Sequence, residues 1–402
     1  MLDVAADSFP SPPFREFVVK IHSRCDLACD YCYVYEMADR SWRDQPARMS
    51  QATARQVAFR IGEHVRAHEV PEIGVVLHGG EPLLAGPDFI AGLVAMIRDA
   101  AGHDVVVHPR VQTNGVRLDE KFLDMFRRLG IEVGVSLDGA AAAHDRHRRF
   151  RDGRGSHAAV AAGLALLTSP RYRDLFSGVL CVIDPRNDPL DTYHALLSCG
   201  PPKTDFLLPH GHWDAPPPGR VADPARTPYA DWLITIFDDW YARPRTRVRL
   251  FEEIVRALLG GTSGAESVGA APVNVVVVET NGAIEQVDTL KAAFHGASRT
   301  GLDVERDAFD AALWLPEIAA RHWGVRALCT RCQECHLSRV CGGGLYAHRY
   351  RAATGFANPS VYCPDLMRLI DHIRATVQAD VDRRLGTHGV GAHGAGARGV
   401  PR

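Results

Sequence analysis

The stretch FVVKIHSRCDLACDYC (residues 17–32) combines an apolar strand pattern with three cysteines directly behind it. Its first half predicts a buried strand, and the loop that follows carries Cys25, Cys29 and Cys32. A cubane 4Fe–4S cluster usually takes four thiolates, so three leave one iron open to a small molecule. Catalytic metal sites keep an open position in the same way. The alternative is a zinc site that His22 or a remote residue completes.

Short apolar runs alternate with helical patterns outward from this stretch. Strands are predicted at Phe17–Ser23, Ile73–His78, Val105–Gln112, Val133–Leu137, Gly178–Ile183 and Phe206–Leu208. Helical spacing falls at Gln51–His68, Asp88–Ala100, Asp119–Leu129 and Ala158–Leu167. This alternation predicts an α/β fold with a parallel sheet, here a partial (β/α)6 TIM-type barrel. In such barrels the chemistry gathers at the C-terminal ends of the strands.

The 402 residues are enough for this barrel and a smaller C-terminal module. Inside the module, Asn281-Gly282 is typical of a tight hairpin between two short strands. A Gly-rich composition at the end of the chain indicates a disordered tail. The predicted parts are an N-terminal fringe (1–15), the barrel (16–228), a helical bridge and linker (229–271), the cysteine-bearing module (272–384) and the tail (385–402).

The composition excludes several classes of function. Hydrophobic residues make up 46% of the chain, which excludes global disorder. The net charge of −2 gives no electrostatic footprint for nucleic-acid binding. The N-terminus has neither a basic start nor an apolar run, and no later stretch is apolar enough to cross a membrane. We expect a soluble, cytoplasmic protein with no nucleic-acid or membrane partner.

Eight of the ten cysteines fall into two groups, three near the start of the chain and five near its end. Disulfides are rare in the cytosol, so clustered cysteines there indicate metal or cluster ligands. Four cysteines of the second group have spacings that suit a structural zinc site, which spacing alone slightly favours, or a fully ligated 4Fe–4S cluster. These four are Cys332, Cys335, Cys341 and Cys363. Cys329 has no assigned role.

The first cysteine loop, with Tyr31 before its last cysteine, and Gly79-Gly80-Glu81-Pro82 after the second strand resemble the radical SAM superfamily. In that superfamily S-adenosylmethionine binds the open iron, and an electron from the cluster cleaves it to a 5′-deoxyadenosyl radical. The resemblance implies that the cofactor contacts Tyr31, Gly79, Gly80, Glu81, Thr113, Asn114, Ser136, Asp138 and Arg148. Arg148 would pair with the cofactor carboxylate, with Arg149 or a solvated basic run as the alternatives.

The second cysteine group resembles the SPASM domain of peptide-modifying enzymes, which implies an auxiliary 4Fe–4S cluster on its four cysteines. A full SPASM pattern has further cysteines where this chain has Val287 and Leu345, so we expect one auxiliary cluster. Asp288 stands where several such enzymes have a base for a substrate proton, and an ordinary turn residue is the alternative. His210, His212 and Trp213, after the sixth strand, are expected to face the peptide channel, with a His-x-His metal pair as the alternative.

Four stretches resemble the FxsB-type peptide maturases more closely: CYVYE (32–36), VETNG (278–282) with EQVD (285–288), CGGGLYAHR (341–349) and NPSVYC (358–363). This resemblance implies a carbon–carbon crosslink between the Cβ of one residue and an aromatic ring in a ribosomal precursor peptide, called a cyclophane. It also implies an electron donor such as flavodoxin or ferredoxin. The alternatives are another SPASM-type reaction, either thioether formation or sulfatase formylglycine maturation, and a non-catalytic zinc-binding scaffold.

Overall fold

The computed structural model describes residues 12–220, 223–270, 272 and 274–389. Its strands form one ten-stranded sheet in the order β10-β9-β8-β1-β2-β3-β4-β5-β6-β7. The strands are β1 Glu16–His22, β2 Glu72–Gly79, β3 Val106–Thr113, β4 Glu132–Ser136, β5 Phe176–Val182, β6 Lys203–Leu207, β7 Arg247–Val248, β8 Val275–Val278, β9 Ala283–Glu285 and β10 Arg299–Asp303. The helices are α1 Gln51–Ala67, α2 Pro87–Ala101, α3 Glu120–Leu129, α4 Ala141–His147, α5 His157–Leu167, α6 Pro189–Leu197, α7 Pro228–Ala242, α8 Arg249–Leu258, α9 Phe309–Leu313, α10 Pro316–Ala319, α11 Thr330–Gln333, α12 Ser338–Cys341 and α13 Cys363–Gly389.

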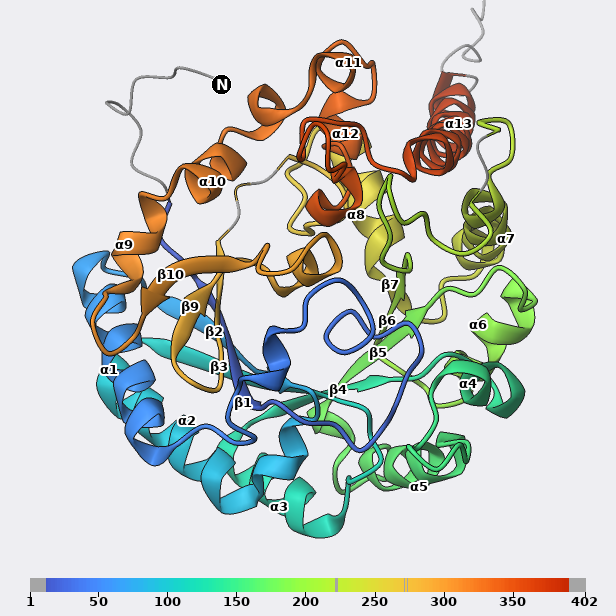
Figure 1. The fold of residues 1–402 in the computed structure, drawn as a ribbon. Coiled ribbons are helices and arrows are strands. Elements are labelled where there is room, and N and C mark those ends of the chain that lie inside the picture. Colours follow the sequence, from blue (N-terminus) through green and yellow to red (C-terminus); the bar gives the residue numbers. More distant parts are fainter. Residues whose placement is uncertain (1–11, 221–222, 271, 273, 390–402) are drawn as a thin grey trace, which may run out of the picture.

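Strands β1 to β7 pair in parallel, which confirms the predicted partial barrel. Helices α1, α2, α3, α5 and α6 lie around the outside of the curved sheet (Figure 1). Local capping begins several of these helices where the chain leaves a loop. At α1 the Ser50 side chain accepts a hydrogen bond from the Thr53 amide, and at α3 Asp119 does the same for Phe122. The sequence pattern missed α4, α6 and the short strand β7.

The predicted hairpin forms between β8 and β9, which pair antiparallel on either side of Asn281-Gly282. Strand β8 also pairs in parallel with β1, so the C-terminal part of the chain extends the barrel sheet. Side chains from both parts share one hydrophobic core, from Phe17 in β1 to Ile370 in α13. Because the core is shared, it does not mark where one predicted domain ends and the next begins, and these boundaries stay a prediction. In Figure 1 the segment from α9 to α13, in orange and red, runs across the side between the two edges of the sheet.

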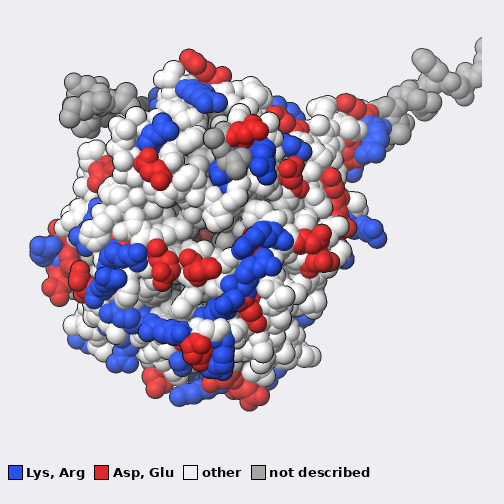
Figure 2. All heavy atoms as spheres, turned by 45° about the vertical axis from the view of Figure 1, so that its right-hand side comes forward, with Lys and Arg blue, Asp and Glu red and all other residues white. Residues whose placement is uncertain are grey.

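The last helix, α13, extends to Gly389, beyond the predicted end of the module at residue 384. The remainder of the predicted tail, 390–402, and most of the predicted N-terminal fringe, 1–11, lie outside the described residues. Across the described part of the chain, the helices are too short or too polar to span a membrane. Figure 2 shows bands of basic side chains interleaved with acidic ones on one face, in keeping with the small net charge.

Candidate active site

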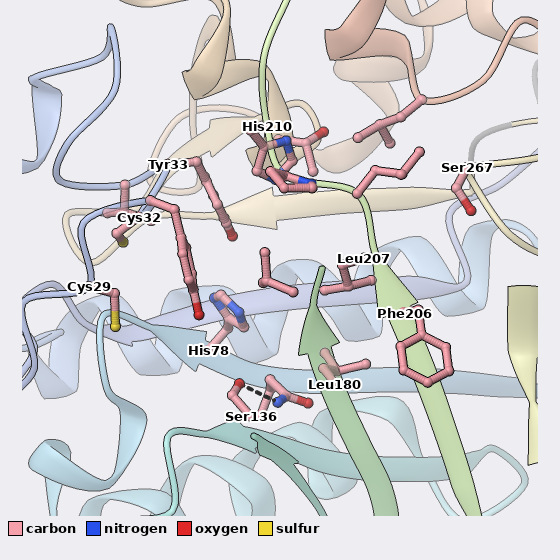
Figure 3. A pocket seen from close by; sticks show the side chains of 18 of the residues that line it. Cys29, Cys32, Tyr33, His78, Ser136, Leu180, Phe206, Leu207, His210 and Ser267 are labelled. Atoms are coloured by element: carbon pink, nitrogen blue, oxygen red, sulfur yellow. Dashed lines mark hydrogen bonds between the residues drawn. The ribbon is translucent and has the colours of Figure 1, made fainter. Parts of the chain in front are cut away.

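A cavity of about 480 Å³ lies at the C-terminal ends of strands β2 to β6. Pockets of this size hold one small molecule or part of a larger one. Its wall combines the first cysteine loop, the strand ends, residues 264–267 and four residues of the C-terminal part, Thr289, Leu345, His348 and Leu366. Figure 3 shows Cys29 and Cys32 at one side of this cavity and Ser267 at the other. Parts of the chain far apart in sequence therefore meet at one site.

All three cysteines of the first group line this cavity. The loop folds tightly, since the Cys32 amide donates to the Cys29 carbonyl at 3.1 Å and the Leu27 amide donates to Cys25 Sγ at 3.4 Å. Burial raises the pKa of Cys25 to about 12 and that of Cys29 to about 11. Without a metal these thiols are neutral at pH 7, and a bound metal would displace their protons.

The two glycines that follow β2 allow the chain to pack against the cysteine loop. Gly79 has a φ of +139°, and a Cβ there would lie 2.1 Å from the His22 carbonyl oxygen. A Cβ on Gly80 would lie 2.6 Å from the Arg24 carbonyl oxygen. The Gly80 amide donates to that His22 oxygen at 2.9 Å, and the next amide, of Glu81, donates to the Arg24 oxygen at 3.0 Å. Both glycines also line the cavity, so the predicted close backbone approach is available there.

Glu81 was predicted to contact the cofactor, but it lies behind the cavity wall. Its buried carboxylate accepts hydrogen bonds from the Leu83 amide at 3.0 Å, the Thr113 hydroxyl at 2.7 Å and the Asn114 amide at 2.8 Å. Burial raises the pKa of Glu81 to about 7, although the three donors favour the charged form. Thr113 and Asn114 do line the cavity, as does Ser136, whose hydroxyl accepts from Gln112 at 3.1 Å (Figure 3). Glu81 therefore positions cavity residues rather than facing the cavity itself.

Arg148 is the buried arginine of its basic run, while Arg149 is exposed. Arg148 Nη1 donates to the Tyr31 hydroxyl at 2.8 Å, and Tyr31 donates in turn to Asp138. The other Asp138 oxygen accepts from the Val182 amide at 3.0 Å. Tyr31 and Arg148 line the cavity, whereas Asp138 stands behind them and holds Tyr31 in place. A buried guanidinium beside the cysteine loop excludes the alternative of a solvated basic run and suits a carboxylate ligand.

Three histidines are among the polar residues that line the cavity: His78, His210 and His348. Burial lowers the pKa of each, to about 4 for His210, so the rings are neutral at pH 7. His210 therefore lies where the sequence predicts. His212 does not line the cavity, and its ring instead packs 5.1 Å from that of Tyr350.

The second cysteine group gathers around α11, α12 and the start of α13, and none of its thiols lines the cavity. Cys332 shares a hydrogen bond with Cys329, and both Cys341 and Cys363 act electrostatically on Cys332. Cys335 acts in the same way on Cys341 and Cys363. The structure thus brings the four predicted ligands together and adds Cys329 to them. Burial raises the pKa of Cys332 to about 12 and that of Cys341 to about 11.

In neither cysteine group of the described residues do three sulfur atoms all lie within 4.8 Å of one another. Among the described residues, two groups of three candidate ligands have all their ligand atoms within 4.8 Å of one another, and neither group contains a cysteine. Thiolates around one zinc ion would have sulfur atoms about 3.8 Å apart, given Zn–S bonds of about 2.3 Å. Neither group therefore has three sulfur atoms at the spacing of a closed zinc site.

Asp288, the predicted base, is buried one side chain behind the cavity. One oxygen accepts from the Tyr33 hydroxyl at 3.0 Å, and Tyr33 itself lines the cavity. The other oxygen accepts from Lys20 Nζ at 2.5 Å, and that lysine also donates to Glu279 at 2.8 Å. Burial raises the pKa of Asp288 and the nearby Lys20 and Lys291 lower it more, so it lies below its ordinary value. Asp288 is therefore ionised, and it reaches the cavity through Tyr33.

Residues 19–194 match the family model of the Radical SAM superfamily. The chain carries a radical SAM domain. Over 357 residues it is 27% identical to the serine-type anaerobic sulfatase-maturating enzyme of Klebsiella aerogenes, covering 86% of this chain and 83% of the relative. Over 380 residues it is 20% identical to the cysteine-type anaerobic sulfatase-maturating enzyme of Clostridium perfringens, with coverage of 90% and 96%.

Two solved structures share the fold of this chain. The structure of native anSMEcpe with bound AdoMet superposes with a TM-score of 0.77 at 18% identity, covering 91% of this chain and 99% of that one. Streptococcus suis SuiB bound to the precursor peptide SuiA superposes with a TM-score of 0.58 at 13% identity, covering 89% and 77%. The similarity of fold thus extends beyond the radical SAM domain into the C-terminal part.

The match of residues 19–194 to the superfamily model implies S-adenosylmethionine and a 4Fe–4S cluster. The donor set fits that cluster, because three thiols from one loop line the cavity and Arg148 lies beside them. Other residues of the wall had no role predicted from the sequence, among them Tyr33, His78, His348 and residues 264–267. Tyr33 and His78 directly adjoin the recognised motifs, which is the signal that would have found them. Residues 264–267 carry no such signal, since their Gly/Ser-rich composition predicts a linker.

Proposed function

We propose that this radical SAM enzyme crosslinks a ribosomal precursor peptide through a carbon–carbon bond between a Cβ atom and an aromatic ring. One observation carries the proposal. Among the described residues, three cysteines line the cavity, and all three come from the loop after β1. A cluster held by three thiols keeps one iron accessible to a small molecule. Beyond this loop the cavity is lined mainly by apolar and neutral polar groups, with Arg249 and Glu266 as charged members, and such a wall suits a peptide segment.

The residues of the cavity divide between cofactor and peptide in this proposal. When bound, the cluster and S-adenosylmethionine supply a carbon radical that removes a hydrogen atom from the peptide. Arg148 and Tyr31 hold the cofactor carboxylate, which a buried guanidinium recognises through paired hydrogen bonds. Thr113, Asn114 and Ser136 face the rest of the cofactor. Glu81 and Asp138 keep these groups in position from behind.

The crosslink also requires a proton acceptor and an electron acceptor. Attack of the peptide radical on an aromatic ring must be followed by loss of one proton and one electron before the ring is aromatic again. Asp288 is ionised and takes the proton through the Tyr33 hydroxyl, to which it is hydrogen-bonded. The four cysteines Cys332, Cys335, Cys341 and Cys363 would hold an auxiliary 4Fe–4S cluster that supplies an electron acceptor. A flavodoxin or ferredoxin would deliver the electron that starts the cycle.

The test is anaerobic co-expression of the enzyme with a small precursor peptide encoded beside it, followed by tandem mass spectrometry. We expect a product that has lost two hydrogens, resists fragmentation between the linked residues and does not react with a hydrazide. A product that fragments normally throughout, or that consumes a cysteine to form a thioether, would contradict the crosslink.

The second candidate is formylglycine formation in a sulfatase, favoured by the full-length similarity to two types of sulfatase-maturating enzyme. Oxidation of serine to formylglycine also removes two hydrogens, so mass alone does not separate the two reactions. A hydrazide distinguishes them, because it captures the aldehyde and leaves a crosslink untouched. A serine-containing or cysteine-containing sulfatase peptide that becomes hydrazide-reactive would establish this second function.

A further inference from the structure

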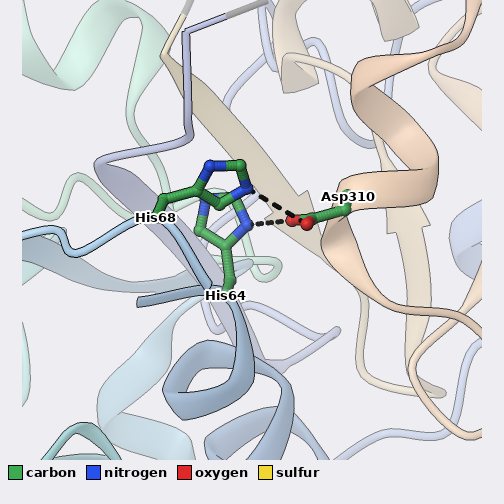
Figure 4. A group of neighbouring side chains, drawn as sticks. All are labelled: His64, His68 and Asp310. Carbon is green, nitrogen blue, oxygen red and sulfur yellow. Dashed lines mark hydrogen bonds and ion pairs between the residues drawn. The ribbon is translucent and has the colours of Figure 1, made fainter. Parts of the chain in front are cut away.

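A second group of potential ligands lies on the outside of the barrel, where α1 meets α9. It consists of His64 and His68, one helical turn apart along α1, and Asp310 of α9 (Figure 4). His64 Nδ1 lies 2.5 Å from one Asp310 oxygen, and His68 Nε2 lies 3.1 Å from the other. A spacing of four residues places two histidines on the same face of a helix. None of the three side chains lines the cavity of the active site.

The 3.1 Å between His68 Nε2 and its Asp310 oxygen suits two ligands that share one ion, whereas the 2.5 Å between His64 Nδ1 and the other oxygen is a hydrogen bond that an ion would replace. Around a tetrahedral zinc ion, with bonds of about 2.0–2.2 Å, neighbouring nitrogen and oxygen ligands lie about 3.3 Å apart. His68 Nε2 is buried at 3.1 Å from its Asp310 oxygen but makes no hydrogen bond within the described residues. One ring nitrogen or oxygen from each of the three residues lies within 4.8 Å of the others. A metal ion would satisfy this buried nitrogen, which the protein alone does not.

The charges nearby distinguish this group from the other cluster of potential ligands, Glu279, Glu285 and Asp288. Those three carboxylates pair with Lys20 and Lys291, which neutralise them. Among the described residues, the ion pairs of Asp310 are with His64 and His68 alone. A cation between the two rings would therefore find a carboxylate that has no lysine or arginine partner.

The surroundings resemble a protected site with one open side. The His64 ring packs against the rings of Phe14 at 5.8 Å and Phe17 at 5.9 Å, which hold it in place and exclude water on the inner side. The Asp310 side chain is 38% exposed, so solvent reaches the group from outside. Water can then supply a fourth ligand.

We propose that His64, His68 and Asp310 bind one zinc ion that ties α1 of the barrel to α9 of the C-terminal part. Two imidazole nitrogens and one carboxylate oxygen are ligands that zinc accepts, with water in the fourth position. The role is structural, because the site is separate from the cavity. Such an ion would stabilise the contact between two elements about 250 residues apart in sequence.

The test measures zinc and iron in the same sample of enzyme whose cysteine sites have been filled by iron–sulfur reconstitution. After dialysis against zinc sulfate, we expect one zinc equivalent in the wild type that is missing from both His68→Gln and Asp310→Asn. These two side chains are partly exposed, so the variants should keep the fold and the full iron content. His108→Gln, which changes a half-exposed histidine on β3, is the control and should keep the zinc.

Thermal unfolding gives an independent measurement on the same samples. Zinc sulfate should raise the Tm of the wild type and the His108→Gln control by a few degrees and leave that of Asp310→Asn unchanged. A wild type that retains no more zinc than the two variants, or a Tm that zinc shifts equally in all four proteins, would overturn the proposal. The three residues would then form a hydrogen-bonded contact between helices only.

Discussion

The two cysteine groups are similarly buried, but they differ in their position relative to the cavity. The three thiols of the first group line the cavity, next to Arg148 and the strand ends. The thiols of the second group lie outside it, while Leu345 and His348 of the intervening segment form the wall. The position of the thiols at the cavity wall, and not their number alone, therefore distinguishes a site open to a small molecule from a closed one.

The largest effect is expected from breaking the first group. Cys29→Ala leaves two thiols, too few to hold the cluster, so 5′-deoxyadenosine formation should fall at least about a thousandfold. The measurement is 5′-deoxyadenosine by liquid chromatography, with iron content in parallel. Cys199→Ser is the matched control, because Cys199 belongs to neither group and lies outside the cavity. Cofactor cleavage by Cys29→Ala at the rate of this control would contradict the assignment.

Breaking the second group should separate cofactor cleavage from product formation. Cys332→Ala is expected to lose the auxiliary cluster, so that peptide product falls to background while 5′-deoxyadenosine formation stays within about threefold of the wild type. Iron and sulfide analysis should show the loss of one cluster. Cys329→Ala tests the neighbouring thiol, which hydrogen-bonds to Cys332. Iron loss in Cys329→Ala with none in Cys332→Ala would show that Cys329, and not Cys332, is a ligand of the auxiliary cluster.

Asp288 stands between the two groups in sequence, and its substitution should affect product alone. Asp288→Asn keeps the shape of the side chain but accepts no proton, so product should fall about 10²- to 10⁴-fold while 5′-deoxyadenosine still forms. In the wild type the pKa of Asp288 lies below its ordinary value, so the base stays ionised and product per cofactor cleaved should not change between about pH 8 and pH 6. Loss of product on acidification within this range would point to a different base.

The smallest effect is expected at Arg148, beside the first group. Arg148→Lys keeps the charge but loses the forked geometry, so the KM for S-adenosylmethionine should rise about tenfold to a hundredfold, with a smaller change in kcat. Arg149→Lys is the matched control, because Arg149 is exposed and donates to the Asp145 carbonyl. Equal changes in both variants would show that Arg148 does not contact the cofactor.

The barrel could be predicted from sequence because its strands are apolar and its helices amphipathic. Strands β1 to β5 begin and end within two residues of the predicted ranges. Strand β6 begins earlier, at Lys203, because Thr204 and Asp205 are polar but buried. Asp205 is compensated by Arg249, whose Nε donates to it at 2.7 Å. A pattern based on apolar residues cannot detect a strand whose buried charge is neutralised by a residue more than forty positions later.

The candidate site was predictable where it follows strand ends and unpredictable where tertiary contacts decide it. The cysteine loop, the two glycines and Arg148 lie at the cavity because the C-terminal ends of parallel strands meet there. The predicted linker contributes residues 264–267 to the wall, since the Gly264 amide donates to the buried carboxylate of Glu253 at 2.8 Å. Composition alone gives no indication of such a contact. For the same reason, Glu81 and Asp138 were expected in the cavity and lie behind it.

The pairing of β1 with β8 has a consequence for the order of events during protein synthesis. Strand β1 leads into the first cysteine loop, yet Val18 pairs with Val277, which leaves the ribosome after most of the chain. Lys20 likewise finds its buried partners, Glu279 and Asp288, only then. Contacts of such long range form slowly and leave strand edges exposed until they close. We therefore expect cells to load the first cluster after translation is nearly complete.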